Sequence, residues 1–142
     1  MKIFVSGQID DIANVRSVQS KLVAAGHTIT HDWTRNETGD KMLAKPEDKL
    51  RDIQETGRRA ELDINGVVDC DAYVICTDNE KVGKGMYVEL GAALALQATT
   101  NKPKIFLLGN MNHMSVFYFH PSVIHLATLD ELVKELASHT NV

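Results

Sequence analysis

At residues 72–76 the chain reads Ala-Tyr-Val-Ile-Cys, and after a loop the helical segment at residues 83–96 reads Gly-Lys-Gly-Met-Tyr-Val-Glu-Leu-Gly-Ala-Ala-Leu-Ala-Leu. A strand that is apolar throughout is typical of the centre of a parallel sheet, because helices cover both faces of such a sheet. The helical segment is apolar on every side, which predicts that it packs between other elements.

Glu89 interrupts this apolar helix and is the only carboxylate between Gly83 and Gln97. Burying a charge is costly. The positive end of the helix dipole favours the ionised carboxylate near the start of a helix, whereas burial raises its pKa. Helix physics leaves two interpretations open, a capping carboxylate and a reactive acid.

Outward from this unit, strand patterns and helical patterns alternate along the chain. Further strands are expected at residues 3–7, 27–30, 104–109 and 123–126, and further helices at residues 12–25, 47–67 and 130–138. This alternation predicts a parallel sheet with right-handed crossovers and helices on both sides. We therefore expect an α/β three-layer sandwich with a five-stranded parallel sheet, in a single domain spanning residues 1–142.

The helical pattern at residues 47–67 has a stripe of apolar or small residues at intervals of three or four. Its members are Leu50, Ile53, Gly57, Ala60, Ile64 and Val67. Asp63 falls along the same stripe, and a carboxylate in a buried position needs a partner or a function. A local hydrogen bond, an ion pair with Arg59 and a catalytic role are all open.

Charge and cysteine content narrow the class of partner. Fifteen basic and nineteen acidic residues give a net charge of −4, unlike the basic surface that binds nucleic acid polymers. A small-molecule ligand is favoured instead. Cys70 and Cys76 lack the spacing of a zinc or redox motif and are expected to be buried thiols. No apolar run has the length of a signal peptide or membrane span, so we expect a cytoplasmic protein without membrane contact.

Ligands of such sheets bind beyond the carboxyl ends of the strands. In this chain that edge gathers residues 7–9, 31–33, 78–89 and 110–120. Trp33 is either a face for a planar base or a plug for its loop. The glycines at 83 and 85 either admit a phosphate or form a tight turn. The histidines form no recognisable metal set, so no metal is expected.

Five motifs resemble the nucleoside 2-deoxyribosyltransferase family and together span nearly the whole chain. They are Lys2–Ile9, Ala60–Gly66, Asp71–Ile75, Gly85–Ala93 and Lys102-Pro103, and the most specific is Glu89-Leu90-Gly91 with Gly85 before it. The family contains base-exchanging transferases and a branch of deoxynucleoside 5′-monophosphate N-glycosidases. The resemblance implies a flavodoxin-like fold, a homodimer or larger homo-oligomer, and double displacement without metal or cofactor.

The resemblance also implies residue roles. Glu89 matches the nucleophile, and Asp63 matches the carboxylate that handles the proton of the leaving base. Gln8 and Ile9 lie where the family wraps the base, and Ser115 aligns with a serine that reaches the phosphate from a neighbouring subunit. The predicted substrate site therefore comprises Gly7, Gln8, Ile9, Trp33, Gly83, Lys84, Gly85 and Ser115.

Two positions depart from the family pattern. Phe4 replaces a tyrosine that steadies the nucleophile, so this hydrogen bond is missing or comes from elsewhere. Gly83 replaces the aspartate of the transferases and the serine of the monophosphate branch. Lys84 with Ser115 favours a 5′-phosphorylated substrate. The alternatives are a nucleotide-binding module without catalysis and an NAD glycohydrolase.

Overall fold

The apolar segment at residues 72–76 forms β3 (Ala72–Cys76), the central strand of a five-stranded parallel sheet. The computed structural model describes residues 1–36, 43, 45–81 and 85–140. The other strands are β1 (Lys2–Ser6), β2 (Thr28–Ile29), β4 (Lys104–Leu108) and β5 (Val123–Leu126). Their order, β2-β1-β3-β4-β5, is the flavodoxin-like order, and it confirms the predicted α/β class.

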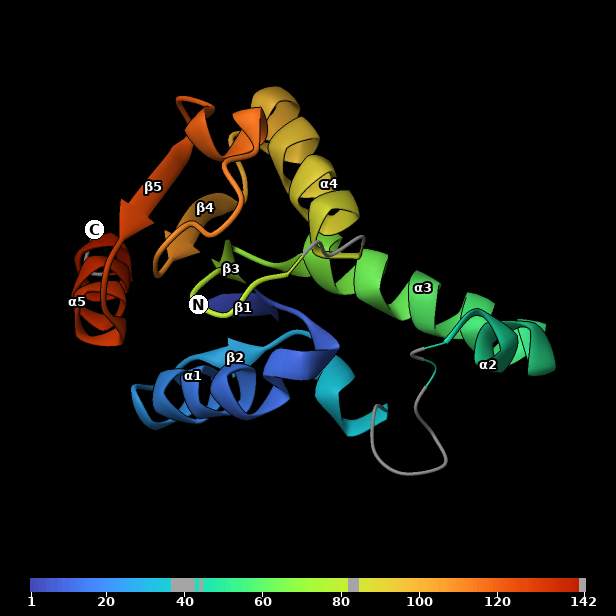
Figure 1. Ribbon diagram of the computed structural model, residues 1–142. Coiled ribbons are helices and arrows are strands. Elements are labelled where there is room, and N and C mark those ends of the chain that lie inside the picture. Colours follow the sequence, from blue (N-terminus) through green and yellow to red (C-terminus); the bar gives the residue numbers. More distant parts are fainter. Residues whose placement is uncertain (37–42, 44, 82–84, 141–142) are drawn as a thin grey trace.

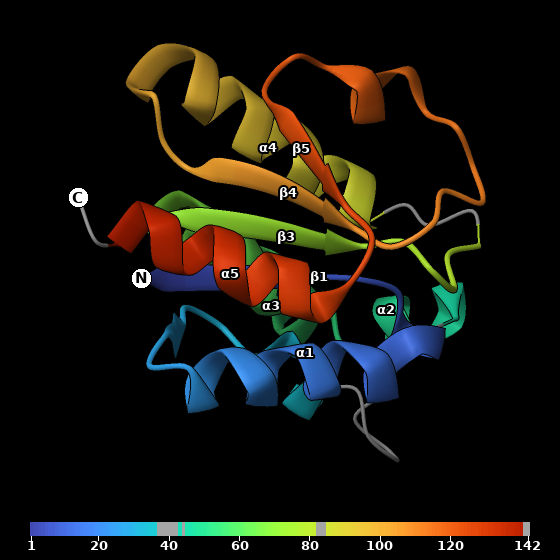
Figure 2. The same ribbon diagram turned by 90° about the vertical axis from the view of Figure 1, so that its left-hand side faces the viewer.

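Helices cover both faces of the sheet (Figures 1 and 2). One face carries α1 (Ile12–Ala24) and α5 (Leu129–Thr140), and the other carries α3 (Ile53–Asp69) and α4 (Gly85–Thr100). Shorter pieces are α2 (Pro46–Arg51) and the 3-10 turns η1 (Ile9–Asp11), η2 (Trp33–Asn36) and η4 (Val116–Phe119). No helix in the described part of the chain is both long and apolar enough to cross a membrane.

Parallel strands bring their carboxyl ends to one edge. Ser6 at the end of β1 lies opposite Ile75 of β3, and Cys76 lies opposite Leu108 of β4. The segments that follow these strands therefore meet at this edge of the sheet, next to the start of α4. This is the edge at which the sequence predicts ligand binding.

The prediction of a single helix at residues 47–67 is wrong. The chain breaks at Asp52, with φ −142° and ψ 85°, and the Asp52 side chain accepts a hydrogen bond from the Glu55 amide at 3.1 Å. It thereby caps α3. Leu50 and Ile53 are 73% and 69% exposed, because α2 and the first half of α3 extend away from the sheet (Figure 1).

The expectation that α4 is packed on every side is also wrong. Met86, Glu89, Leu90, Ala93 and Leu94 face the interior. Val88 is 64% exposed and Gly91 is exposed. The helix covers one face of the sheet and leaves an apolar face of its own uncovered.

Candidate active site

The Glu89 side chain lies where the end of β1 meets the beginning of α4. It is 9% exposed, and the Ser6 hydroxyl donates a hydrogen bond of 2.7 Å to its Oε1 atom. Ser6 is the last residue of β1 and is fully buried. Among the described residues, this is the one hydrogen bond of the Glu89 carboxyl group.

The charge of Asp63 from α3 affects the pKa of the same carboxyl group. Burial is the main reason that the pKa of Glu89 is raised to about 8, and the negative charge of Asp63 is the second. The hydrogen bond from Ser6 acts in the opposite direction, since it stabilises the ionised form. A buried and a partly buried carboxyl group from different helices thus interact electrostatically, an arrangement that is typical of acid–base sites.

His31 completes this group from the segment after β2. Its Nε2 atom lies 3.5 Å from Asp63 Oδ1. Burial is the main cause of a lowered His31 pKa, which favours the neutral ring. The sequence predicts that residues 31–33 lie at this edge, but it assigns no role to His31 by itself. The only indication of a functional His31 in the sequence is its position directly after a predicted strand.

Gly66 lets α3 approach β1 and His31 closely. A Cβ atom at Gly66 would lie 2.8 Å from Phe4 Cδ2 and 3.0 Å from His31 Cβ. The Thr30 hydroxyl donates to the Gly66 carbonyl at 2.8 Å. This contact fixes the helix that carries Asp63 against the segment that carries His31.

The hydroxyl groups around Glu89 come from positions that sequence reasoning missed. Phe4 lacks a hydroxyl, but its ring stacks on Tyr73 of β3 with a centroid distance of 6.1 Å and an interplanar angle of 5°. The Tyr73 hydroxyl donates to the Met86 carbonyl at 3.2 Å. Burial first, and the Glu89 charge second, raise the pKa of Tyr73 well above its usual value. The hydroxyl groups near Glu89 thus belong to Ser6 and Tyr73.

The Gln8 side chain is held by the loop after β3. The Lys81 amide donates to Gln8 Oε1 at 2.8 Å, and Gln8 Nε2 donates to the Lys81 carbonyl. Gly7 is packed so closely that a Cβ atom there would lie 2.5 Å from Val15 Cγ2. Ile9 begins η1 and packs partly buried against the core. These three residues connect the end of β1 to the neighbouring loop.

The structure places Trp33 in the core, which corrects the expectation of a ring that stacks on a base. Trp33 is 9% exposed, and its Nε1 atom donates to the Val5 carbonyl at 2.8 Å. The ring therefore plugs its loop, which was the alternative interpretation. A Trp in a polar segment gave no signal that separated the two.

The remaining predicted residues are Gly83, Lys84, Gly85 and Ser115, of which the structure describes Gly85 and Ser115. Gly85 is the exposed first residue of α4. Ser115 caps η4, and its Oγ atom accepts a hydrogen bond from the Phe117 amide at 3.3 Å. Gly83 and Lys84 lie outside the described residues.

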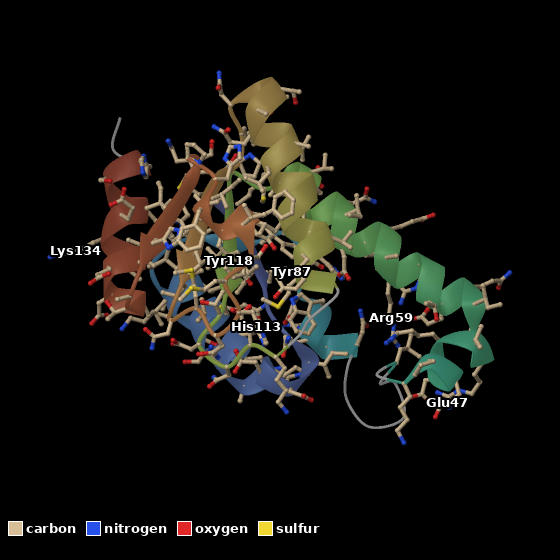
Figure 3. All side chains as sticks on the ribbon, turned by 45° about the horizontal axis from the view of Figure 1, so that its top comes forward. Glu47, Arg59, Tyr87, His113, Tyr118 and Lys134 are labelled. Carbon is tan, nitrogen blue, oxygen red and sulfur yellow. The ribbon has the colours of Figure 1, made fainter. Side chains whose placement is uncertain are left out.

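Glu80 is a second buried glutamate at this edge and is 4% exposed. Its carboxylate accepts hydrogen bonds from the Tyr118 hydroxyl, the Asn112 amide at 3.2 Å and the His113 amide at 3.1 Å. Figure 3 shows Tyr118, Tyr87 and His113 near one another, far from Glu47 and Arg59. Glu80 thus ties the loop after β3 to the segment before η4.

The described residues contain no group of three His, Cys, Asp or Glu side chains with the geometry of a metal site. Cys70 and Cys76 are free and buried, as predicted. Burial raises the pKa of both thiols, so both are unreactive as thiolates at neutral pH.

The chain resembles solved protein structures in its fold. No family model matches the chain, and no curated protein matches its sequence. The CMP N-glycosidase BcmB of Clostridium botulinum is 14% identical with a TM-score of 0.57, over 96% of this chain and 99% of the glycosidase. A 2-deoxyribosyltransferase of Bacillus psychrosaccharolyticus is also 14% identical with a TM-score of 0.57, over 94% of this chain and 90% of the transferase. This likeness shows that the chain has the fold of both enzymes.

Proposed function

We propose that this protein cleaves or transfers at the N-glycosidic bond of a (deoxy)nucleoside or nucleoside 5′-monophosphate, through a glycosyl-enzyme intermediate on Glu89. The observation that carries the proposal is the buried Glu89 carboxyl group, which accepts a hydrogen bond from Ser6 and has a pKa raised by burial and by Asp63. Its place at the carboxyl edge of a parallel sheet adds support. The names of the two enzymes with this fold describe reactions of the same class.

The proposed reaction has two displacements. In the first, a Glu89 oxygen attacks C1′ of the sugar, the C1′–N bond breaks with its electron pair moving to the base, and Asp63 gives the base a proton. In the second, water or another base attacks C1′, the ester bond to Glu89 breaks, and Asp63 takes the proton of the incoming group. The stereochemistry at C1′ is retained, because each displacement inverts it.

The coupling between the two carboxyl groups supplies the proton that this reaction needs. Because the charge of Asp63 contributes to the raised pKa of Glu89, the pair resists losing its second proton. When the shared proton sits on Asp63, Glu89 is ionised and nucleophilic while Asp63 is the acid. We propose that the neutral His31 ring, 3.5 Å from Asp63, orients that acid.

Substrate contacts belong to the same proposal. We assign the sugar and base to the surface around Gly7, Gln8 and Ile9, and the 5′-phosphate to Lys84 with Ser115. Gly83 and Gly85 give the phosphate access to the start of α4. Trp33 has no part, because its ring is buried.

We also propose a homodimer or larger homo-oligomer. Ser115 is flanked by exposed apolar side chains, which are Met114, Val116, Phe117 and Phe119. An apolar cluster of this kind marks an interaction surface. A second copy seated here would bring Ser115 towards a neighbouring active site. Analytical ultracentrifugation of the wild type and of Phe117→Ser tests this: the variant is expected to sediment as a smaller species, and a monomeric wild type would refute it.

The activity is tested by incubating the protein with deoxynucleosides, ribonucleosides, their 5′-monophosphates and NAD, with and without a second base. Base release alone identifies a hydrolase, and base exchange identifies a transferase. Peptide mass spectrometry after an acid quench is expected to find the sugar on the peptide that contains Glu89. Tight nucleotide binding with no product from any substrate would refute catalysis. Cleavage of NAD alone would show that the substrate is NAD and not a nucleoside or its 5′-monophosphate.

A further inference from the structure

A cavity of about 1080 Å³ lies beside the edge strand β2, between α1, η2 and α3. Three of its lining residues are arginines: Arg16 from α1, Arg35 from η2 and Arg58 from α3. Among the described residues, Ser6, Asp63 and Glu89 are not part of the lining. The cavity is therefore a separate space from the candidate active site, although His31 lines it.

The charges around this cavity do not balance. Arg35 pairs with Asp32 at 3.2 Å, and Glu55 is shared by Arg58 at 2.7 Å and Arg59 at 3.0 Å. Within the described residues Arg16 has no carboxylate partner. Among the described residues, the three arginines that line the cavity thus meet two carboxylates, those of Asp32 and Glu55, an excess of one positive charge in a chain whose net charge is −4. Such a local excess favours an anion.

Arg16 is held in place by neutral groups. Its Nε atom donates to Thr34 Oγ1 at 3.1 Å, and its Nη2 atom donates to the Thr34 carbonyl at 3.0 Å. These bonds fix the plane of the guanidinium group and leave its other terminal nitrogen for a ligand. A fixed, uncompensated guanidinium group is suited to phosphoryl oxygens, which accept its N–H groups in a planar fork.

The remaining wall is partly apolar. Val23 of α1, Ile29 of β2 and Leu62 of α3 line the same cavity. A volume slightly above the usual range for small-molecule sites suits an organic molecule rather than a single inorganic ion. We propose that this cavity is a second site that binds an organic phosphate, with its phosphoryl group on Arg16 and its organic part against Val23, Ile29 and Leu62.

A ligand bound in this cavity would affect the candidate active site through His31. The ring lines the cavity, and its Nε2 atom lies 3.5 Å from Asp63 Oδ1. Binding at the cavity stands independently of the proposed reaction, because it depends on the arginines and the apolar wall alone.

The test is a nuclear magnetic resonance titration of the ¹⁵N-labelled protein with ADP and, separately, with inorganic pyrophosphate. Amide shifts are expected at residues 16–36 and 58–62, with ADP binding more tightly than pyrophosphate. Arg16→Gln is expected to weaken ADP binding by about tenfold or more, the effect of losing one charge-assisted contact. Arg35→Gln, which alters an 83% exposed side chain and leaves the core intact, is expected to weaken it by about threefold.

The matched control is Arg51→Gln. Arg51 also pairs with an aspartate three residues away, at 3.4 Å, but it does not line the cavity. It is expected to leave ADP affinity unchanged. Shifts confined to the surroundings of Ser6 and Glu89, equal losses in Arg16→Gln and Arg51→Gln, or no saturable shift at millimolar ADP would each overturn the second site. Pyrophosphate binding as tightly as ADP would overturn the role of the apolar wall.

Discussion

Glu80 and Glu89 are both buried glutamates in the segment that follows β3, yet their surroundings differ. Glu80 accepts hydrogen bonds from Tyr118, Asn112 and His113. Among the described residues Glu89 accepts one, from Ser6, and it faces the charge of Asp63. Burial alone therefore does not identify a reactive acid. The balance between donors and neighbouring charges does.

The two regions therefore have different consequences for the molecule. The donors around Glu80 come from a segment more than thirty residues away, so this carboxylate joins two loops. A buried carboxyl group with such a set of donors contributes to folding, because it satisfies buried N–H and O–H groups. Among the described residues the Glu89 carboxyl group has one donor, that of Ser6, and in the reaction that we propose the developing positive charge at C1′ stabilises its ionised form.

The largest effect is expected for Glu89→Gln. The amide keeps the shape of the side chain and can still accept from Ser6, but it is a poor nucleophile. If the proposed reaction holds, kcat/KM falls by about a thousandfold or more. Rates of base release measured by chromatography check this.

The matched control for that variant is Glu61→Gln, which removes a carboxylate from an exposed position of α3. Its rate is expected to equal that of the wild type. A Glu89→Gln protein that keeps full activity would remove Glu89 from the mechanism, whatever the substrate.

The second prediction concerns the pH dependence of stability. The pKa of Glu89 is about 8 in the folded protein against an ordinary value of 4.5, so the folded state binds more protons than the unfolded state between these two pH values. The contribution of Glu89 to stability is thus complete below about pH 4.5 and is lost as the pH rises through 8, by an amount on the order of 5 kcal/mol.

Urea unfolding at pH 5 and pH 8.5 measures this loss. Glu89→Gln is expected to be more stable than the wild type at pH 8.5 and nearly equal to it at pH 5. Equal differences at the two pH values would contradict the raised pKa.

The third prediction addresses Glu80. In Glu80→Gln an amide group replaces one acceptor oxygen beside the Tyr118 hydroxyl, so the buried donors lose part of their partner. The free energy of unfolding is expected to fall by about 2 kcal/mol. Activity per folded molecule should fall far less than in Glu89→Gln. A stable Glu80→Gln protein without activity would reverse the roles that we assign to the two glutamates.

Much of the fold follows from the sequence because strands and helices have different periods. The apolar segment at residues 72–76 predicted β3, and the alternation of elements predicted the parallel sheet. The break at Asp52 and the exposed Leu50 were not predictable in this way. Periodicity shows which side of a helix is apolar, but it does not show whether another element covers that side.

The site was predictable in part for a similar reason. Glu89 and Asp63 stood out because a carboxylate on an apolar surface is unusual. Trp33, His31 and Tyr73 required knowledge of which strands are neighbours, since their contacts join segments far apart in the chain. A short sequence motif contains none of that information.

Ser6 is the residue at which the comparison of Glu80 and Glu89 can be tested most finely. Ser6→Ala removes the hydrogen bond of 2.7 Å to Glu89 and with it the interaction that favours the ionised carboxylate. The pKa of Glu89 should rise further, so the ascending limb of kcat/KM against pH is expected to move to higher pH, with a loss of about tenfold at neutral pH. Ser122→Ala, which removes a hydroxyl contact of 2.9 Å with Gln97, serves as the control and should leave the profile unchanged. A uniform loss in Ser6→Ala at every pH would mean that Ser6 only fills space. A shifted limb would mean that a single donor sets the proton affinity of Glu89, whereas the donors around Glu80 set the stability of a loop.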